Sequence, residues 1–171
     1  MPAVPDVLAV TAFDQLAPAQ AAALLLPCCA SRRWAAEVVR GRPYGTLARL
    51  SAASDECISA LDWADIGQAL QAHPRIGSRL AGAGREASWS AQEQRSAVTA
   101  STPEHDRLRE ANEAYERRFG HVFLICASGR SAEQVLASLR ERLDNDPAAE
   151  REVVRAELRD IARLRLAKAF R

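Results

Sequence analysis

WADIGQALQAHPRIG, the sequence of residues 63–77, joins an apolar helical stripe to a turn that contains proline and glycine. The stripe consists of Trp63, Ile66 and Leu70, and the next position on the same helical face is His73. Proline disfavours the α conformation of the residue before it, so we expect the helix to end near His73. The negative end of the helix dipole favours a protonated imidazole there. The stretch predicts either a proton-transferring histidine or a histidine that only caps a helix.

The composition is that of a globular helical protein with enough residues for one domain with a core. The chain has 171 residues, of which 48% are hydrophobic and 26% are charged. The net charge of +1 gives no sign of a polyanion-binding surface, and 5% aromatic residues are too few for a nucleic-acid stacking platform. Alanine and leucine are abundant and β-branched residues are scarce, which favours helix.

The cysteines and the chain ends show no pattern typical of a metal site, a disulfide framework or a targeting sequence. No CxxC occurs and the histidines lack zinc-finger spacing, so we expect reduced, buried thiols and no metal site. No apolar run approaches the ~18 residues of a membrane span. No charged segment precedes an apolar run at the N-terminus, and the C-terminal Lys168-Ala169-Phe170-Arg171 is not a peroxisomal signal. We expect a cytoplasmic protein.

Helix signals recur along most of the chain. Pro18, Ser31, Thr46 and Asp62 stand where helices can begin, and Gly120 stands where one can end. The fold prediction is all-α, a single-domain multi-helix bundle over residues 1–171 with its core at about 10–168. An irregular lead-in to about residue 12 and a loop over 74–88 are also expected. The expected helices cover about 18–26, 32–40, 46–60, 63–72, 103–119, 132–143 and 147–170.

Ser90 and Glu93 have the spacing of a capping box. This spacing predicts that a helix begins at Ser90. Free N–H groups at such a helix start also suit an anion, so a structural role and a binding role are compatible.

Residues 122–127 form an apolar run that is too short for a helix and predicts an extended segment. No partner strand is evident, yet buried peptide groups need hydrogen-bond partners. A ligand or a polar side chain could supply them, and Asn112 is a candidate because it lies on the apolar face of the helix before the run.

Arg165 continues the apolar stripe of the last helix, which is formed by Val154, Leu158 and Ile161. An arginine is rarely buried without a partner, so it meets a carboxylate, waits for one, or extends past the end of the stripe to solvent. Arg163 falls on the opposite face and should be exposed.

Four blocks of sequence resemble the 2-oxo-4-hydroxy-4-carboxy-5-ureidoimidazoline (OHCU) decarboxylases, the last enzymes of the route from urate to allantoin. They occur in family order over about residues 10–168. The blocks are His73-Pro74-Arg75-Ile76-Gly77, Ser90-x-x-Glu93-Gln94, Asn112-x-x-Tyr115-x-x-x-Phe119-Gly120-x-x-Phe123-x-x-Cys126-x-x-Gly129 and Ile161-x-x-Leu164-Arg165-Leu166.

The resemblance implies an all-α fold, a homodimer and decarboxylation of a small ureidoimidazoline without a cofactor, giving (S)-allantoin and CO2. The composition and the lack of a long apolar run, by themselves, predict no nucleic-acid or membrane partner. His73 resembles the catalytic acid and Glu93 its partner, and Arg165 resembles the arginine that meets the substrate carboxylate. The substrate contacts implied by the resemblance are Pro74, Ser90, Ala91, Gln92, Glu93, Gln94, Phe123, Leu124, Ile125, Cys126, Ala127 and Arg165.

Two other functions remain open on sequence grounds. A non-catalytic helical module could keep the pocket for a purine-like ligand, and would bind allantoin without changing the decay of the substrate. A helical interaction protein could use every one of these polar residues structurally, but it leaves the extended segment unexplained.

Overall fold

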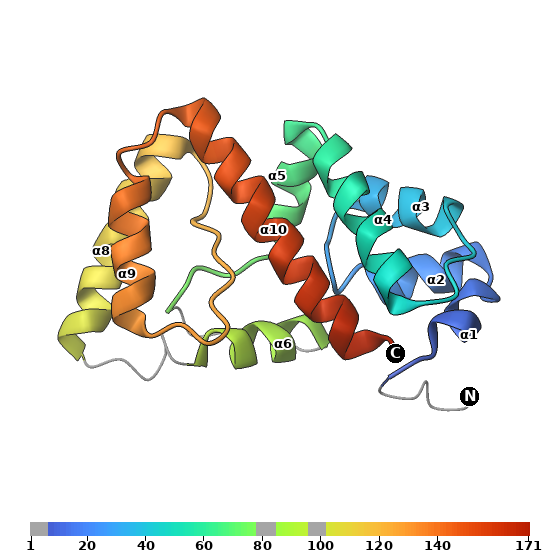
Figure 1. The fold of residues 1–171 in the computed structure, drawn as a ribbon. Coiled ribbons are helices and arrows are strands. Elements are labelled where there is room, and N and C mark those ends of the chain that lie inside the picture. The colour runs from blue at the N-terminus through green and yellow to red at the C-terminus, as the bar shows by residue number, and fades with distance from the viewer. Residues whose placement is uncertain (1–6, 78–84, 96–101) are drawn as a thin grey trace. The chain divides into compact units, whose positions relative to one another are not determined.

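The computed structural model describes residues 7–77, 85–95 and 102–171, and within them the fold is all-α (Figure 1). Leu8 and Phe170 form an isolated parallel bridge, and residues 122–127 are extended but belong to no sheet in the described chain. The helices are α1 (Val10–Asp14), α2 (Pro18–Leu25), α3 (Arg32–Arg40), α4 (Leu47–Ala60), α5 (Trp63–Gln71), α6 (Arg85–Glu93), α8 (Thr102–Phe119), α9 (Ala132–Arg142) and α10 (Pro147–Ala169).

The expected helix starts are confirmed by side chains that accept hydrogen bonds from the first turn. The Ser31 hydroxyl accepts from the Trp34 amide, Thr46 caps α4, and the Asp62 carboxylate accepts from the Asp65 amide at 2.9 Å. That amide contact lowers the pKa of Asp62, because it stabilises the ionised carboxylate. Ser131 and Gln134 form a complete capping box at the start of α9.

Two expectations about irregular regions are wrong. The lead-in contains α1, whose Val10 and Phe13 are buried, so apolar packing outweighs the weak helix signal of this short stretch. The loop expected over 74–88 is shorter, because α6 already begins at Arg85. Its residues 78–84 lie outside the described chain.

The chain divides into two compact units, and the division falls within α5 and within α10. The first unit comprises Met1–Ala69 and Leu158–Arg171, and the second comprises Leu70–Glu157.

The first unit packs around large apolar side chains that are all fully buried, namely Phe13, Leu25, Trp34, Ile58 and Phe170. The Phe13 and Phe170 rings meet edge to face at 5.0 Å, and the Leu8 amide donates to the Ala169 carbonyl. A buried phenol, Tyr44, donates to the Val38 carbonyl at 2.7 Å. Burial raises the pKa of Tyr44 to about 12 because it disfavours the phenolate.

The second unit is built on α8 and α9, which lie side by side (Figure 1). Gly120, with φ of +76°, ends α8 and allows the chain to turn into the extended residues 122–127. Those residues contribute to one hydrophobic cluster with both helices, formed by Ile76, Leu108, Tyr115, Phe123, Ile125, Ala127, Val135, Leu136 and Leu139.

None of the helices in the described part of the chain combines the length and the apolar character that crossing a membrane requires.

The capping box of α9 yields a stability prediction. Ser131→Ala should lower the free energy of unfolding by about 1 kcal/mol, because it removes the acceptor for the Gln134 amide. Urea denaturation measures the change. Ser51→Ala is the control, since Ser51 lies inside α4, where alanine is the better helix former. An equal loss in both variants would show that the box contributes nothing.

Candidate functional site

His73 lies in the turn that follows α5, as the apolar stripe and the proline predict. It is 9% exposed, and its amide donates to the Leu70 carbonyl at 3.0 Å. The turn ends at Gly77, which has φ of +80°. A Cβ at Gly77 would also lie 3.0 Å from a methyl carbon of Leu108, so both conformation and space require glycine. The backbone around His73 is therefore tightly constrained.

Two amide side chains hold this turn by its main chain. The Gln94 side chain accepts from the Gly77 amide at 3.3 Å and donates to the Pro74 carbonyl at 3.4 Å. Asn112 of α8 donates to the Ile76 carbonyl at 3.2 Å. The turn is thus attached to α8 and to the residue after α6.

Ser90, Glu93 and Gln94 occupy the last turn of α6 and the residue that follows it, so the prediction that a helix begins at Ser90 is wrong. The helix already begins at Arg85, and the Gln94 amide donates to the Ser90 carbonyl as in a helix C-terminus. Residues three apart also lie on the same face of a helix, and Ser90 and Glu93 share the buried face of α6. This end of α6 carries carbonyl groups rather than free N–H groups, so the helix-start anion site expected at Ser90 is not formed there.

Burial divides this block into two faces. Ser90, Glu93 and Gln94 are buried, at 2%, 9% and 5% exposure. Ala91 and Gln92 are exposed. Side chains of the first group can line an internal site, whereas those of the second point to solvent.

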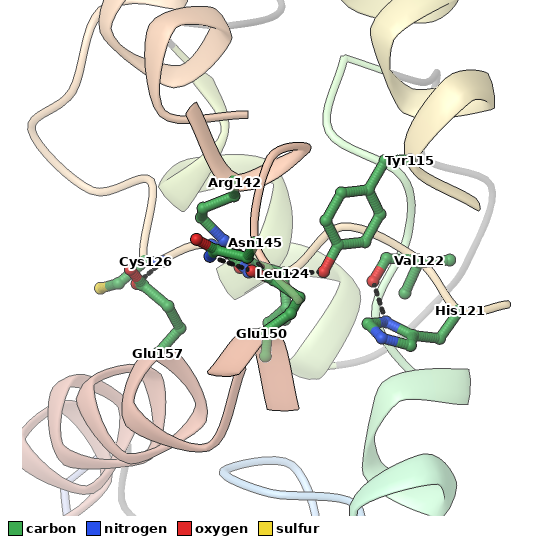
Figure 2. Close-up of polar contacts among 9 residues, drawn as sticks. All are labelled: Tyr115, His121, Val122, Leu124, Cys126, Arg142, Asn145, Glu150 and Glu157. Carbon is green, nitrogen blue, oxygen red and sulfur yellow. Dashed lines mark hydrogen bonds and ion pairs between the residues drawn. The ribbon is translucent and has the colours of Figure 1, made fainter. Parts of the chain in front are cut away.

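Side chains pair with three peptide groups of the extended segment 122–127 (Figure 2), and the Ala127 carbonyl accepts from the Arg130 amide at 3.0 Å. Arg142 of α9 donates to the Leu124 carbonyl at 2.8 Å, and Glu157 of α10 accepts from the Cys126 amide at 2.7 Å. The His121 ring contacts the Val122 carbonyl at 3.0 Å. Asn112, suggested by the sequence as a partner of this segment, instead donates to Ile76 and Leu108. That expectation is wrong because the amide faces the His73 turn.

Arg142 belongs to a buried charged cluster that Figure 2 shows beside the segment. Its guanidinium donates through Nε and Nη2 to Glu150 Oε1, at 2.9 and 2.6 Å, and both side chains are almost completely buried. The Tyr115 hydroxyl donates to the same carboxylate, and Asn145 donates to its other oxygen at 2.8 Å. The guanidinium also stacks on the Phe123 ring at 4.5 Å.

The cluster also fixes the protonation of its phenol. Burial, followed by the hydrogen bond to Glu150, raises the pKa of Tyr115 above its ordinary value. The phenol therefore stays neutral and donates its hydrogen bond to the Glu150 side chain.

Sequence reasoning missed Arg142 and Glu150, although a signal was present. Val135 and Leu139 define the inward face of α9, and Arg142 is the next position on that face. Glu150 likewise precedes Val154 by one helical step on the inward face of α10. Extending each apolar stripe by one step would have placed both charges in the interior.

Arg165 is 1% exposed in the first unit, and its Nη1 donates to the Pro27 carbonyl at 3.0 Å. The alternative in which it extends to solvent is therefore wrong. Arg163 is 53% exposed, as expected, and its guanidinium contacts Asp55 of α4 at 2.5–3.0 Å. The two arginines are separated by one residue and have opposite environments.

Within the second unit, the structure thus brings three of the predicted blocks together. Gln94 contacts the His73 turn, and Ile76 of that turn shares a hydrophobic cluster with Phe123, Ile125 and Ala127. Arg165 is described in the first unit. In the described chain, no group of three histidine, cysteine or acidic side chains has a metal-binding arrangement. None of the four cysteines, all of which lie in the described residues, forms a disulfide.

A family model for OHCU decarboxylase matches residues 14–167. The uric acid degradation bifunctional protein TTL of Arabidopsis thaliana is 34% identical over 146 residues, covering 84% of this chain and 45% of that protein. The 2-oxo-4-hydroxy-4-carboxy-5-ureidoimidazoline decarboxylase of Amia calva is 35% identical over 134 residues, covering 77% of each chain. This chain thus spans less than half of the plant protein.

Solved structures agree with these similarities. A crystal structure of OHCU decarboxylase in the presence of (S)-allantoin has a TM-score of 0.73 and 29% identity, covering 84% of this chain and 94% of that one. A crystal structure of (S)-allantoin synthase is similar in fold, with a TM-score of 0.72 and 21% identity over 95% of this chain and 54% of that one.

The buried charged cluster predicts a large effect of a single substitution. Glu150→Ala should reduce the free energy of unfolding by about 3–5 kcal/mol, because it leaves the Arg142 guanidinium buried without its carboxylate. Glu152→Ala is the control on the same helix. Its side chain is 72% exposed and contacts Arg155 at 3.6 Å, so a change within about 0.5 kcal/mol is expected. Similar losses in urea denaturation of both variants would contradict the assignment of a buried pair.

Proposed function

This chain belongs to the OHCU decarboxylase family, and from that membership we propose that it decarboxylates 2-oxo-4-hydroxy-4-carboxy-5-ureidoimidazoline to (S)-allantoin and CO2, the last step of urate degradation. The observation that carries the proposal is the family match over residues 14–167, which contains every residue of the candidate site. The match also runs through both compact units, which supports one functional domain over residues 1–171.

We propose His73 as the catalytic acid and Glu93 as the group that orients its ring and favours its protonated form. The constrained turn around His73 supports this role, since proton transfer requires a positioned donor. The burial of Glu93 supports its role, because a carboxylate acts more strongly on a neighbouring charge away from water.

The remaining proposed substrate contacts come from three of the sequence blocks. Main-chain groups of Phe123–Ala127 would pair with the ureido and ring amides, which suits an extended segment that belongs to no sheet in the described chain. Pro74, Ser90 and Gln94 would add contacts. Ala91 and Gln92 are exposed, so any contribution from them would come through the main chain.

In the proposed reaction, the C5=N bond of the substrate accepts the electron pair that decarboxylation releases. Loss of CO2 breaks the bond between the carboxylate carbon and ring carbon C4. The electron pair forms a C4=C5 bond while the C5=N π pair moves to nitrogen, which takes a proton. The C4=C5 pair then takes a proton at C5, while the C4 hydroxyl gives up its proton to solvent and becomes a carbonyl. Delivery of that proton to one face by His73 gives a single allantoin enantiomer.

Arg165 is the proposed partner of the substrate carboxylate. A planar guanidinium can bind a carboxylate through two parallel hydrogen bonds. Its burial supports the role, because a carboxylate that loses its hydration passes more readily to neutral CO2. The contact to the Pro27 carbonyl fixes the guanidinium through a group that does not neutralise its charge.

A homodimer and a cytoplasmic location are the remaining parts of the proposal. The family resemblance in the four sequence blocks supports the homodimer, and light scattering of the purified protein measures the assembly directly. The cytoplasmic location is the expectation drawn from the sequence signals.

The first activity prediction concerns His73. His73→Ala should fold normally and lose on the order of 10²–10⁴-fold in the rate of (S)-allantoin formation, because it removes the acid. Circular dichroism at the allantoin band measures this rate with freshly generated substrate, which otherwise decays to the racemate. Gln71→Ala is the control, since that side chain is exposed at the end of α5. Wild-type activity in His73→Ala would remove the imidazole from the mechanism.

The second activity prediction concerns Arg165. Arg165→Lys keeps the charge but loses the two-pronged geometry, so KM should rise on the order of tenfold. Arg163→Lys provides a matched control at an exposed position that contacts Asp55. Steady-state kinetics should therefore separate the two variants, and equal KM values would contradict a substrate-binding role for Arg165.

A further inference from the structure

We propose that Arg142 is a positioning residue that holds the main chain of the extended segment in its ligand-binding form, and that Glu150 fixes Arg142 in place. This inference rests on the proposed function, because it assigns Arg142 a role in recognising that substrate. Neither residue touches the proposed reacting groups directly.

The Arg142 guanidinium binds Glu150 through one edge and the main chain of the segment through its remaining nitrogen. One edge donates twice to Glu150, through Nε at 2.9 Å and Nη2 at 2.6 Å. Nη1 donates to the Leu124 carbonyl at 2.8 Å. The rigid plane of the guanidinium therefore transmits the position of Glu150 to Leu124.

Glu150 is itself held from three sides. Tyr115 of α8 donates to the oxygen that also accepts from Arg142, and Asn145, which precedes α10, donates to the other oxygen. The carboxylate is 0% exposed, so water cannot replace these partners. The cluster consequently ties α8, α9 and the start of α10 to one peptide group of the segment.

The segment is held at a second point on the same side. In an extended chain the carbonyl of one residue and the amide two residues further on face the same side, as with the Leu124 carbonyl and the Cys126 amide. Arg142 binds the first and Glu157 binds the second. Side chains of alternate residues, Phe123 and Ile125, enter the hydrophobic cluster and fix the register.

An arrangement needed only for stability would not require a buried ion pair. Burying two charges carries a large desolvation cost, and apolar residues of similar size often stabilise a core equally well. The contact of Arg142 with a main-chain carbonyl in the predicted substrate-binding segment gives the pair a different purpose, namely the conformation of that segment.

The test is a double variant, Arg142→Met with Glu150→Gln, which removes both charges together and avoids leaving one buried alone. The control is Arg163→Met with Asp55→Asn, which removes one positive and one negative charge from an exposed pair. Each protein is examined by thermal unfolding, by hydrogen exchange of peptides covering residues 122–127, and by steady-state kinetics.

We expect the double variant to unfold cooperatively, while exchange in residues 122–127 accelerates on the order of tenfold and KM rises on the order of tenfold with a smaller change in kcat. The control should match wild type in both measurements. Unchanged exchange or an unchanged KM in a folded double variant would overturn the inference. If it does not fold, Arg142→Lys is measured instead, and wild-type exchange and KM there would overturn it equally.

Failure of the proposed function gives a different pattern. A wild-type protein that neither decarboxylates the substrate nor binds (S)-allantoin would contradict that function, and with it the catalytic purpose assigned to Arg142. Hydrogen exchange in the ligand-free variants would still decide whether Arg142 holds the segment.

Discussion

The second unit depends on satisfying the peptide groups of an extended segment that belongs to no sheet in the described chain. Residues 122–127 are mostly buried, and buried N–H and C=O groups are costly when they lack partners. Here Arg142 and Glu157 supply partners from neighbouring helices. A helical protein can in this way contain a short extended segment whose buried peptide groups are paired by side chains of neighbouring helices.

The pairing of the segment with side chains explains why charged residues are buried in the core. A side chain that donates to Leu124 from α9 must be long and carry several donors, and arginine meets both requirements. Its charge then requires a carboxylate, which Glu150 provides. Tyr115 and Asn145 complete the carboxylate's hydrogen bonds, so each group in the cluster follows from the one before it.

The sequence predicted most of the helical framework because its signals are local. Ser31, Thr46 and Asp62 each act within one helical turn, and all three cap as expected. The start of α6 was misplaced because Ser90 and Glu93 satisfy two local patterns equally, a capping box and a buried helical face. Only the residues that pack against the helix decide between these patterns.

The candidate site was predictable to the extent that its residues interrupt apolar stripes. His73, Asn112 and Arg165 were found in this way, and all three are buried. Their partners could not be deduced, because the contact of Asn112 with Ile76 joins residues far apart in the chain. Arg142 and Glu150 were missed because each stands one helical step beyond the apolar residues that define its stripe.

The burial of phenols has a spectroscopic consequence. Tyr44 and Tyr115 are the two tyrosines of the chain, both are buried donors, and the pKa of each is raised, to about 12 for Tyr44. Unfolding restores an ordinary pKa near 10 to both. The unfolded chain thus loses protons at an alkaline pH at which the native chain keeps them, and native stability falls as the pH rises through this range. The ultraviolet absorbance of tyrosinate is therefore a built-in reporter of alkaline unfolding.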